Sequence, residues 1–253
     1  MSSQKIITFA NQKGGVGKST VATLVAQTLS MQKLKTLLIS VDSQSNSPAW
    51  LGVKNEAGKE FADLIIQDLE IKDVVHKVNE NLDVIPKSIR SNTAELILAG
   101  MSNREMLLKR KLKKVSYDIV ILDVAPSIAL GTANAILSST HIFLVSLLEE
   151  ASLRGLATIS AKINELKENE LPVADISGII LNRTNISMRS GHGKMCKQML
   201  ERNYNGLILQ NYLMQNIDLT NACAKGEFLQ DYNPQSKAVK NVESLTNEIL
   251  ERL

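Results

Sequence analysis

A glycine-rich loop, set between an apolar run and an amphipathic segment, constrains this chain more than any other feature. The run 6–9 has the β-branched and aromatic residues of a short buried strand, and the segment 18–31 repeats apolar residues at helical spacing. Strand, glycine loop and helix are the setting of a phosphate-binding loop, whose backbone N–H groups hold phosphate oxygens. The loop consists of Lys13, Gly14, Gly15, Val16, Gly17, Lys18, Ser19 and Thr20.

The polar side chains of the loop have distinct expected roles. We expect Lys18 to bridge the β- and γ-phosphates of a nucleotide, Ser19 to ligate Mg²⁺ through its hydroxyl, and Thr20 to contact the α-phosphate. Lys13 stands five residues before Lys18, where it is poorly placed to reach the phosphates of its own nucleotide. It is able to reach those of a facing subunit, so the loop predicts nucleotide binding and points to a nucleotide-dependent dimer. A solvated lysine is the alternative for Lys13.

The rest of the chain indicates the class of fold. Strand-like runs alternate with helical stretches along 253 residues, which predicts an α/β fold with a mostly parallel twisted sheet and helices on both faces. No linker rich in proline or glycine divides the chain, so we expect one domain over residues 1–253. The strand-like runs are 5–9, 36–41, 82–85, 118–122, 142–147, 176–181 and 207–209.

Composition and charge restrict the cellular compartment and the partners that we expect for the chain. Cys196 and Cys223 lack the spacing of a metal site, and we expect reduced thiols in a cytosolic protein. No apolar run reaches 18 residues, so no segment is predicted to span a membrane. The net charge of +3 is too small by itself to imply a nucleic-acid partner. The segment 183–202, with five basic residues against one acidic residue, is the better candidate for phosphate contacts.

Two aspartates stand at the ends of predicted strands. Asp123 follows the buried run 118–122 and Asp42 follows the run 36–41. Parallel sheets bind ligands at the carboxyl ends of their strands, so we expect Asp123 to hold a water bound to Mg²⁺. A structural cap at the end of a strand is the alternative for each aspartate.

The loop resembles the deviant Walker A motif, Lys-Gly-Gly-x-Gly-Lys-Ser/Thr, of the ParA/MinD family of P-loop ATPases. The resemblance extends over most of the chain and points to ParA-type partition ATPases within that family. It implies an ATP hydrolase with slow basal turnover whose cofactors are ATP and Mg²⁺. It also implies that Lys13 crosses a dimer interface to the partner's ATP, and that Asp42 lies near Mg²⁺ and orients the attacking water. Lys13, Lys18 and Asp42 are therefore the expected catalytic residues.

The chain departs from the family at the segment that contains Asp42. ParA sequences usually have Asp-x-Asp-Pro-Gln-Gly-Asn here, whereas residues 40–46 are Ser-Val-Asp-Ser-Gln-Ser-Asn. The first acid and the proline are missing. Arsenite-pump relatives also have Ser-x-Asp at this point, so Ser40 is compatible with activity.

The resemblance also nominates residues for the base and for DNA. Asn182, at the end of the run 176–181, and Met214 are the expected adenine contacts. Two basic positions of the family are lost, at Asp218 and Gln235, so the DNA surface is expected to have moved or weakened. The expected contacts to non-specific DNA are Arg183, Arg189, Lys194, Lys197, Lys237 and Lys240.

Four functions remain open at this point. The first is a nucleoid-associated ATPase for plasmid or chromosome partition, with a homodimer that a ParB-like partner activates. The second is a ParA relative for a cargo other than DNA. The third is a MinD-like ATPase on membranes, for which the tail 242–253 is amphipathic; its three glutamates disfavour anionic lipid, and we expect it to pack onto the domain instead. The fourth is a metabolic enzyme on the same fold, which would have no evident use for Lys13.

Overall fold

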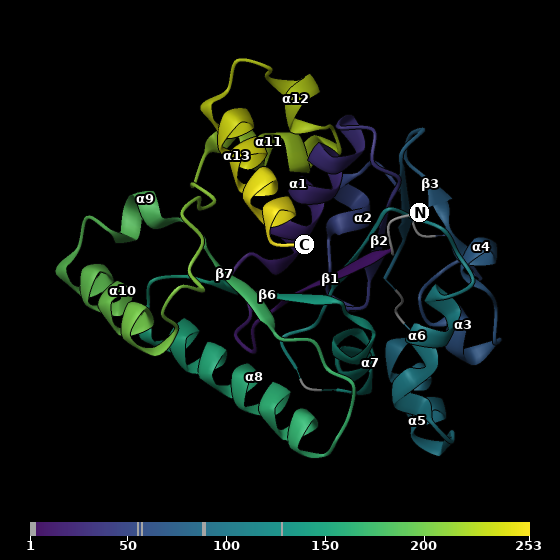
Figure 1. Ribbon diagram of the computed structural model, residues 1–253. Helices are drawn as coiled ribbons and strands as arrows, with labels where there is room; N and C mark the ends of the chain where they lie inside the picture. The colour runs from purple at the N-terminus through teal and green to yellow at the C-terminus, as the bar shows by residue number, and fades with distance from the viewer. Residues whose placement is uncertain (1–3, 55, 57, 88–89, 128) are drawn as a thin grey trace.

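A seven-stranded sheet forms the centre of the molecule in the computed structural model, which describes residues 4–54, 56, 58–87, 90–127 and 129–253. The strand order is β3-β4-β2-β5-β1-β6-β7 (Figure 1). β3 pairs antiparallel with β4, and the other neighbouring strands are parallel. The strands are β1 (Lys5–Ala10), β2 (Thr36–Ser40), β3 (His76–Lys77), β4 (Leu82–Ile85), β5 (Ile119–Asp123), β6 (His141–Ser146) and β7 (Ile176–Leu181).

Helices connect the strands and cover both faces of the sheet. Figure 1 shows α1, α11 and α13 on one side of the sheet, and α7 and α8 on the other. The helices are α1 (Lys18–Met31), α2 (Ser47–Trp50), α3 (Asp63–Ile66), α4 (Ile71–Val74), α5 (Ser91–Gly100), α6 (Leu107–Leu112), α7 (Leu130–Ser138), α8 (Glu150–Glu168), α9 (Thr184–Ser187), α10 (Gly191–Asn203), α11 (Ile217–Lys225), α12 (Leu229–Tyr232) and α13 (Lys237–Glu251), and the 3₁₀ turn η1 (Arg104–Met106) precedes α6.

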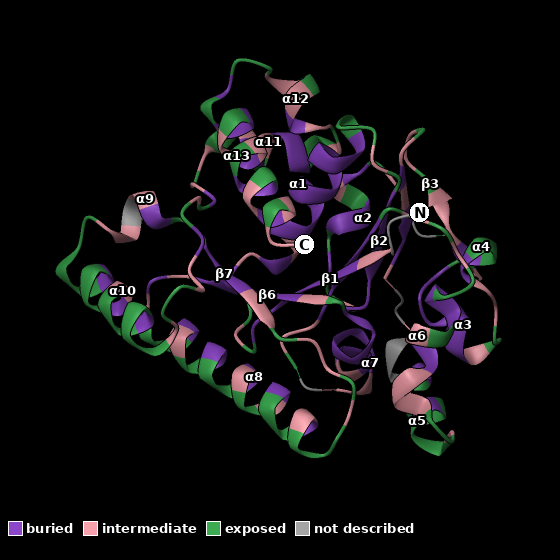
Figure 2. Ribbon diagram, viewed as in Figure 1, coloured by how far each residue is buried: buried purple, intermediate pink, exposed green. Residues whose placement is uncertain are grey.

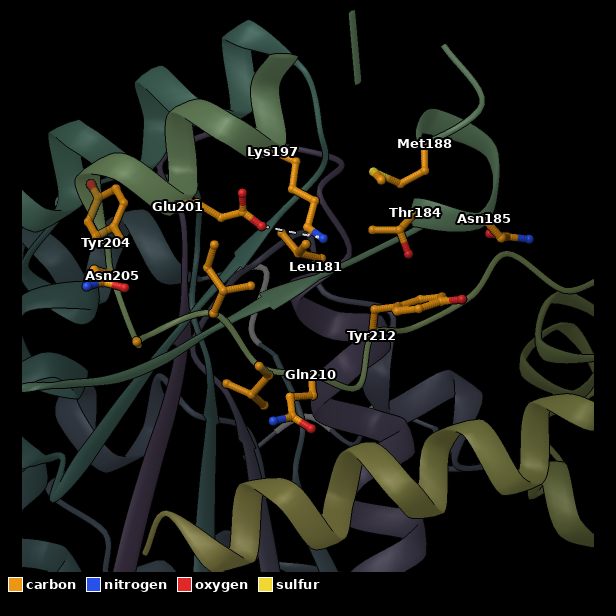
Figure 3. Close-up of a pocket in the computed structure, with 13 residues that line it drawn as sticks. Leu181, Thr184, Asn185, Met188, Lys197, Glu201, Tyr204, Asn205, Gln210 and Tyr212 are labelled. Atoms are coloured by element: carbon orange, nitrogen blue, oxygen red, sulfur yellow. Dashed lines mark ion pairs between the residues drawn. The ribbon is translucent and has the colours of Figure 1, made fainter. Parts of the chain in front are cut away.

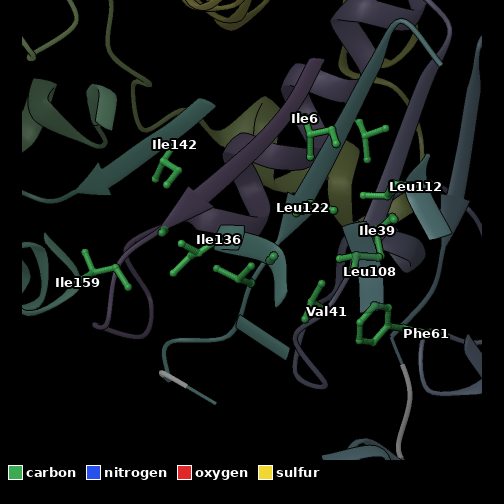
Figure 4. Close-up of a cluster of buried hydrophobic side chains, with 14 of the residues drawn as sticks. Ile6, Ile39, Val41, Phe61, Leu108, Leu112, Leu122, Ile136, Ile142 and Ile159 are labelled. Carbon is green, nitrogen blue, oxygen red and sulfur yellow. The ribbon is translucent and has the colours of Figure 1, made fainter. Parts of the chain in front are cut away.

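Alternation along the strands divides the core into two clusters. In β1, Ile6 and Ala10 belong to one cluster, whereas Ile7 and Phe9 belong to the other. Successive side chains of a strand point to opposite faces, so apolar residues in succession require a cover on both faces. Figure 4 shows part of the first cluster, and Figure 2 shows buried strands beside helices such as α8 whose outer faces are exposed. Burial of each large apolar side chain contributes about 1.5–3 kcal/mol.

The structure confirms the predicted fold class and corrects two details of the strands. The run 207–209 forms no strand, and Ile208 makes only an isolated bridge to Ile179. The backbone N–H groups that follow, at Gln210 and Asn211, donate to the carboxylate of Glu248 at 2.7 Å each, which draws them away from the sheet edge. The edge strand β3 was not predicted because its two residues are polar and carry no apolar alternation.

The C-terminal helix α13 packs against α1, as predicted for the amphipathic tail. Val242, Leu245 and Ile249 of its apolar face are at most 1 % exposed. Within the described residues, no helix combines the length and the apolar character needed to cross a membrane.

Candidate nucleotide-binding site

The predicted phosphate-binding loop leaves the carboxyl end of β1 and leads directly into α1. Gly15 and Gly17 have φ values of +76° and +97°, which glycine adopts at low cost. A Cβ at Gly17 would lie 2.1 Å from Nδ2 of Asn182. Glycine at position 17 is therefore required both by the backbone conformation and by the close approach of the residue after β7.

Lys18 lies at the start of α1 with only 6 % of its surface exposed. Its Nζ donates to the carbonyl oxygen of Lys13 at 3.3 Å. Burial lowers the pKa of Lys18, and the nearby carboxylates of Asp123 and Asp42 oppose this shift. A buried ammonium with one long hydrogen bond is a group that a bound anion would stabilise.

Asp123 ends β5 and is completely buried. Its carboxylate accepts hydrogen bonds from three serine hydroxyls: Ser19 Oγ to Oδ1 at 3.0 Å, and Ser45 Oγ and Ser47 Oγ to Oδ2 at 2.6 and 3.0 Å. Burial raises the pKa of Asp123, the three hydrogen bonds lower it, and the charge of Asp42 raises it. Ser45 and Ser47 were not predicted as site residues. The signal available in the sequence is the serine at every second position after Asp42.

Asp42 lies beside Asp123 because β2 and β5 are neighbours, with Ser40 and Asp123 in register. The backbone N–H groups of Val41 and Asp42 donate to the Asp123 carbonyl oxygen at 2.9 and 3.2 Å. Asp42 Oδ1 accepts a hydrogen bond from the Gln44 N–H at 2.8 Å, which caps the turn after the strand. The capping role that was the alternative for Asp42 is thus present, and the position beside Asp123 remains available for a catalytic role.

The oxygen donors fit Mg²⁺ in combination with a nucleotide. Ser19 Oγ and Asp123 Oδ1 are 3.0 Å apart at the end of the loop. Mg²⁺ prefers oxygen ligands and is usually held by one or two protein groups, waters and substrate phosphates. Over the described part of the chain, no group of three or more His, Cys, Asp or Glu residues could hold a metal by itself. The residues present therefore fit a metal that arrives with phosphate.

Lys13 points away from the buried end of the loop. Its Nζ forms an ion pair with Glu149, the residue before α8. Asn11 holds the backbone here, because its Oδ1 accepts from the Lys13 N–H at 2.8 Å and its Nδ2 donates to the Val145 carbonyl at 2.8 Å. A Cβ at Gly155 of α8 would lie 2.2 Å from Asn11 Oδ1. Glu149 was not predicted, since no local motif marks it.

A cavity of about 360 Å³ lies beside the loop. Thr20, Asn182 and Met214 all line it, so the structure brings together the predicted α-phosphate and adenine contacts. Asn182 is buried, and its Nδ2 donates to the Val16 carbonyl of the loop at 2.8 Å. Trp50 also lines the cavity and was not predicted, because it lies in a short helix without a motif.

The predicted DNA contacts fall on two parts of the molecule, which Figure 1 shows apart. Four of them lie after β7 or along α10, and two lie on α13. Lys197 is half-buried and forms an ion pair with Glu201 at 3.5 Å. The exposed residues of the set are Arg183, Arg189, Lys194, Lys237 and Lys240.

Comparison with known proteins agrees with this geometry. Residues 4–175 match the family model described as AAA domain. The chain is 29 % identical over 249 residues to the sporulation initiation inhibitor protein Soj of Bacillus subtilis (strain 168), covering 97 % of this chain and 98 % of Soj. It is 28 % identical over 253 residues to the chromosome partitioning protein ParA of Myxococcus xanthus (strain DK1622), covering 98 % and 88 %.

The chain belongs to the AAA domain family and is of the ParA/MinD type. Among solved structures, an ATP complex of a Cyanothece McdA variant has a TM-score of 0.86 to this ParA/MinD-type chain, with 23 % identity and coverage of 98 % and 97 %. At that identity the match shows that the fold is shared. The predicted family and fold class are thus confirmed.

Proposed function

We propose that this chain is a Mg²⁺-dependent ATPase, one domain over residues 1–253, that dimerises with ATP and partitions plasmid or chromosomal DNA. The position of Lys13 carries the proposal. Its side chain leaves the start of the loop toward Glu149 and pairs there, whereas Lys18 occupies the buried end of the loop. A second lysine held at the rim of the loop is suited to a phosphate that approaches from outside, on another subunit.

The ion pair at the rim is weak enough to open. The side chains of Lys13 and Glu149 are 32 % and 41 % exposed. Ion pairs with this exposure contribute about 0–1 kcal/mol, because water and salt screen them. The charge of a partner's ATP therefore competes readily for Lys13, and ATP joins two copies of the chain.

The buried groups of the loop act on the chain's own nucleotide. Lys18 neutralises charge at the β- and γ-phosphates, and Thr20 contacts the α-phosphate. Mg²⁺, when bound, would be held by Ser19 and, through a water, by Asp123, and it supplies further charge neutralisation at the phosphates. Asp42 orients the attacking water. Turnover is slow until Lys13 arrives from the partner, because the loop alone lacks that positive charge.

The cavity beside the loop receives the base. Asn182 uses its Nδ2 to hold the Val16 carbonyl, so its Oδ1 is the atom that accepts from the exocyclic amine of adenine. Met214 supplies apolar contact to the ring. This assignment favours ATP, because guanine has a carbonyl in place of that amine.

The exposed basic residues after β7, on α10 and on α13 form the output surface for non-specific DNA, and the protein then associates with the nucleoid. Contacts of lysine and arginine to phosphates carry no sequence information and weaken with salt. A ParB-like partner at the cargo stimulates hydrolysis and releases the dimer.

Gel shifts with ATP, ADP and no nucleotide test the proposal. We expect DNA binding with ATP that is lost with ADP and falls steeply with salt. Binding that is equal in all three conditions, or absent in all three, contradicts a DNA-partition function.

Analytical ultracentrifugation tests the role of Lys13. We expect Lys13→Ala to bind ATP yet stay monomeric, whereas Lys113→Ala, at an exposed lysine after α6, dimerises as the unmodified protein does. Dimerisation of Lys13→Ala with ATP would disprove the cross-subunit role.

One observation favours a ParA relative whose cargo is not DNA. Asp218, at a position where the family has a basic residue, accepts hydrogen bonds from Ser236 Oγ at 2.6 Å and Asn233 Nδ2 at 3.2 Å. An acid held in this way next to α13 lowers the positive potential of that surface. Dimerisation with ATP without any DNA shift would favour this second function.

The MinD-like alternative has less support, because the apolar face of α13 is already packed against the domain. Sedimentation of the protein with liposomes in the presence of ATP would favour that alternative again.

A further inference from the structure

A larger cavity, of about 590 Å³, lies outside the cavity beside the loop that we propose for the base, which is called the nucleotide cavity below. It is lined by residues at the end of β7, on α9 and α10, and in the segment 204–212 (Figure 3). Leu181, Ile208 and Leu209 give it an apolar floor, and Tyr204 and Tyr212 add two aromatic rings. Small-molecule sites in proteins have volumes of about 300–1,000 Å³ and mostly apolar linings, so this cavity has the size and character of a ligand site.

Thr184 lines this cavity and carries a buried hydroxyl. Thr184 is 4 % exposed and lines the cavity, and its Oγ1 has no hydrogen-bond partner in the structure. A buried hydroxyl without a partner is costly, and native proteins usually satisfy such groups. Rotation about χ1 of Thr184 would turn Oγ1 toward the cavity, where a ligand with a hydrogen-bond donor would satisfy it. By contrast, the neighbouring amide of Asn185 is already used, since it exchanges two hydrogen bonds with the Gln215 backbone at 3.0 and 3.2 Å.

The two charges that line the cavity balance each other, so an ionic ligand gains no net attraction there. Lys197 and Glu201 are the charged residues among those that line it, and they form an ion pair with each other at 3.5 Å (Figure 3). A phosphate or carboxylate would have to displace Glu201 from Lys197, and an ammonium would have to displace Lys197. An uncharged ligand requires neither change.

The cavity shares its walls with the nucleotide cavity. After β7, Leu181 and Thr184 line the larger cavity, whereas Asn182 and Arg183 between them line the nucleotide cavity. Arg183 has a φ of +54°, which is costly for a residue with a side chain. Because the strained Arg183 lies between the two cavities, we expect its backbone to respond to a ligand in either one.

The segment after position 207 forms a second shared wall. Tyr212 lines the larger cavity, and Met214, two residues later, lines the nucleotide cavity. A ligand that contacts Tyr212 or Thr184 therefore acts on segments of the chain that also line the nucleotide cavity.

We propose that the larger cavity binds a small, uncharged aromatic molecule with one hydrogen-bond donor, and that its occupancy changes the affinity for nucleotide. The first part is independent of the proposed ATPase function, and the second part rests on it. By linkage, the nucleotide must change the affinity for the aromatic ligand by the same factor.

Indole and 1-methylindole are matched probes for the cavity, because only indole carries an N–H donor. Saturation-transfer NMR titrations are expected to show saturable binding of both probes to the unmodified protein. Tyr212→Ala should weaken both probes about tenfold through the loss of ring contact. Thr184→Val, which keeps the shape of the side chain, should weaken indole about fivefold and leave 1-methylindole unchanged. Thr158→Val, at an exposed threonine of α8, is the control and should change neither probe.

Circular dichroism checks that each variant folds. If Tyr212→Ala does not fold, the comparison of the two probes on Thr184→Val still tests the assignment of the site. Absence of saturable indole binding, or equal weakening of both probes by Thr184→Val, would overturn the assignment of the site. Titration of a fluorescent ATP analogue with Mg²⁺ tests the coupling, and saturating indole is expected to change its Kd at least threefold. An unchanged Kd overturns the coupling. If the analogue does not bind at all, the ATPase proposal fails, whereas the indole titrations still decide the site.

Discussion

Removal of the Ser45 hydroxyl is expected to destabilise the nucleotide-free protein. Ser45 Oγ makes the shortest hydrogen bond to the carboxylate of Asp123, at 2.6 Å, and the two residues are 1 % and 0 % exposed. Water has little access to replace the lost donor. A hydrogen bond to a charged group contributes about 1.5–3 kcal/mol. At about 2–4 °C per kcal/mol for a chain of this size, Ser45→Ala should lower Tm by roughly 3–12 °C.

Thermal unfolding at pH 8, followed by circular dichroism without nucleotide, measures this effect. Ser30→Ala is the matched control, because Ser30 is 3 % exposed and its Oγ donates to a neutral acceptor, the Gln27 carbonyl, at 2.8 Å. A neutral hydrogen bond contributes about 0.5–1.5 kcal/mol, so the control should lose less. The background Asp123→Asn keeps the shape of the side chain, removes its charge and leaves one oxygen that is able to accept from Ser45. In that background the cost of Ser45→Ala should fall to the neutral range.

Asp123→Asn alone should raise Tm at pH 8. Burial raises the pKa of Asp123 in the folded state, which means that ionisation of this group disfavours folding. Stability is therefore lost as the pH rises from the ordinary pKa of aspartate through the raised one, and the neutral amide avoids this loss. Equal costs of Ser45→Ala in both backgrounds, or a cost no greater than that of Ser30→Ala, would refute the view that charge makes this contact strong.

Three further changes test other parts of the site. Gly155→Ala should weaken binding of an ATP analogue at least tenfold in fluorescence titrations, because its Cβ would displace the turn before the loop. Gly191→Ala is the control and should leave binding unchanged, because its Cβ meets nothing within 4 Å. Glu149→Gln should lower the ATP concentration needed for dimerisation, by at most about fivefold for so exposed an ion pair, and a higher requirement would contradict this. Burial raises the pKa of Cys223 to about 11, so alkylation of this thiol at pH 8 should be slow. Cys223 lines the nucleotide cavity and Cys196 does not. Peptide mass spectrometry should therefore find that nucleotide slows alkylation further at Cys223 and leaves alkylation of Cys196 unchanged.

Local patterns were enough to predict the class of fold and the nucleotide loop. Alternating and continuous apolar runs mark the main strands, and the loop with its two lysines is contiguous in the chain. The segment 18–31 was predicted as a helix and forms α1 over the same residues. Such features depend on neighbours within a few residues, so the sequence contains them directly.

The surroundings of Asp123 and Lys13 depend on contacts between distant residues. Ser45 reaches Asp123 across 78 positions, and Lys13 reaches Glu149 across 136. The strand order brings these residues together, because β2 lies beside β5, β6 lies beside β1, and the carboxyl ends of these parallel strands share one edge. No local periodicity records which serine or glutamate arrives there.

The sequence by itself determined that this chain builds a glycine-rich loop between a strand and a helix, with a lysine at each end, since glycines, lysines and the flanking elements act over short range. The tertiary structure alone decided where the side chains of those lysines lie. Packing buries Lys18 beside two carboxylates and leaves Lys13 at the rim in a weak ion pair. The physical reason is that burial and charge depend on which elements meet in space, and those elements are far apart along the chain.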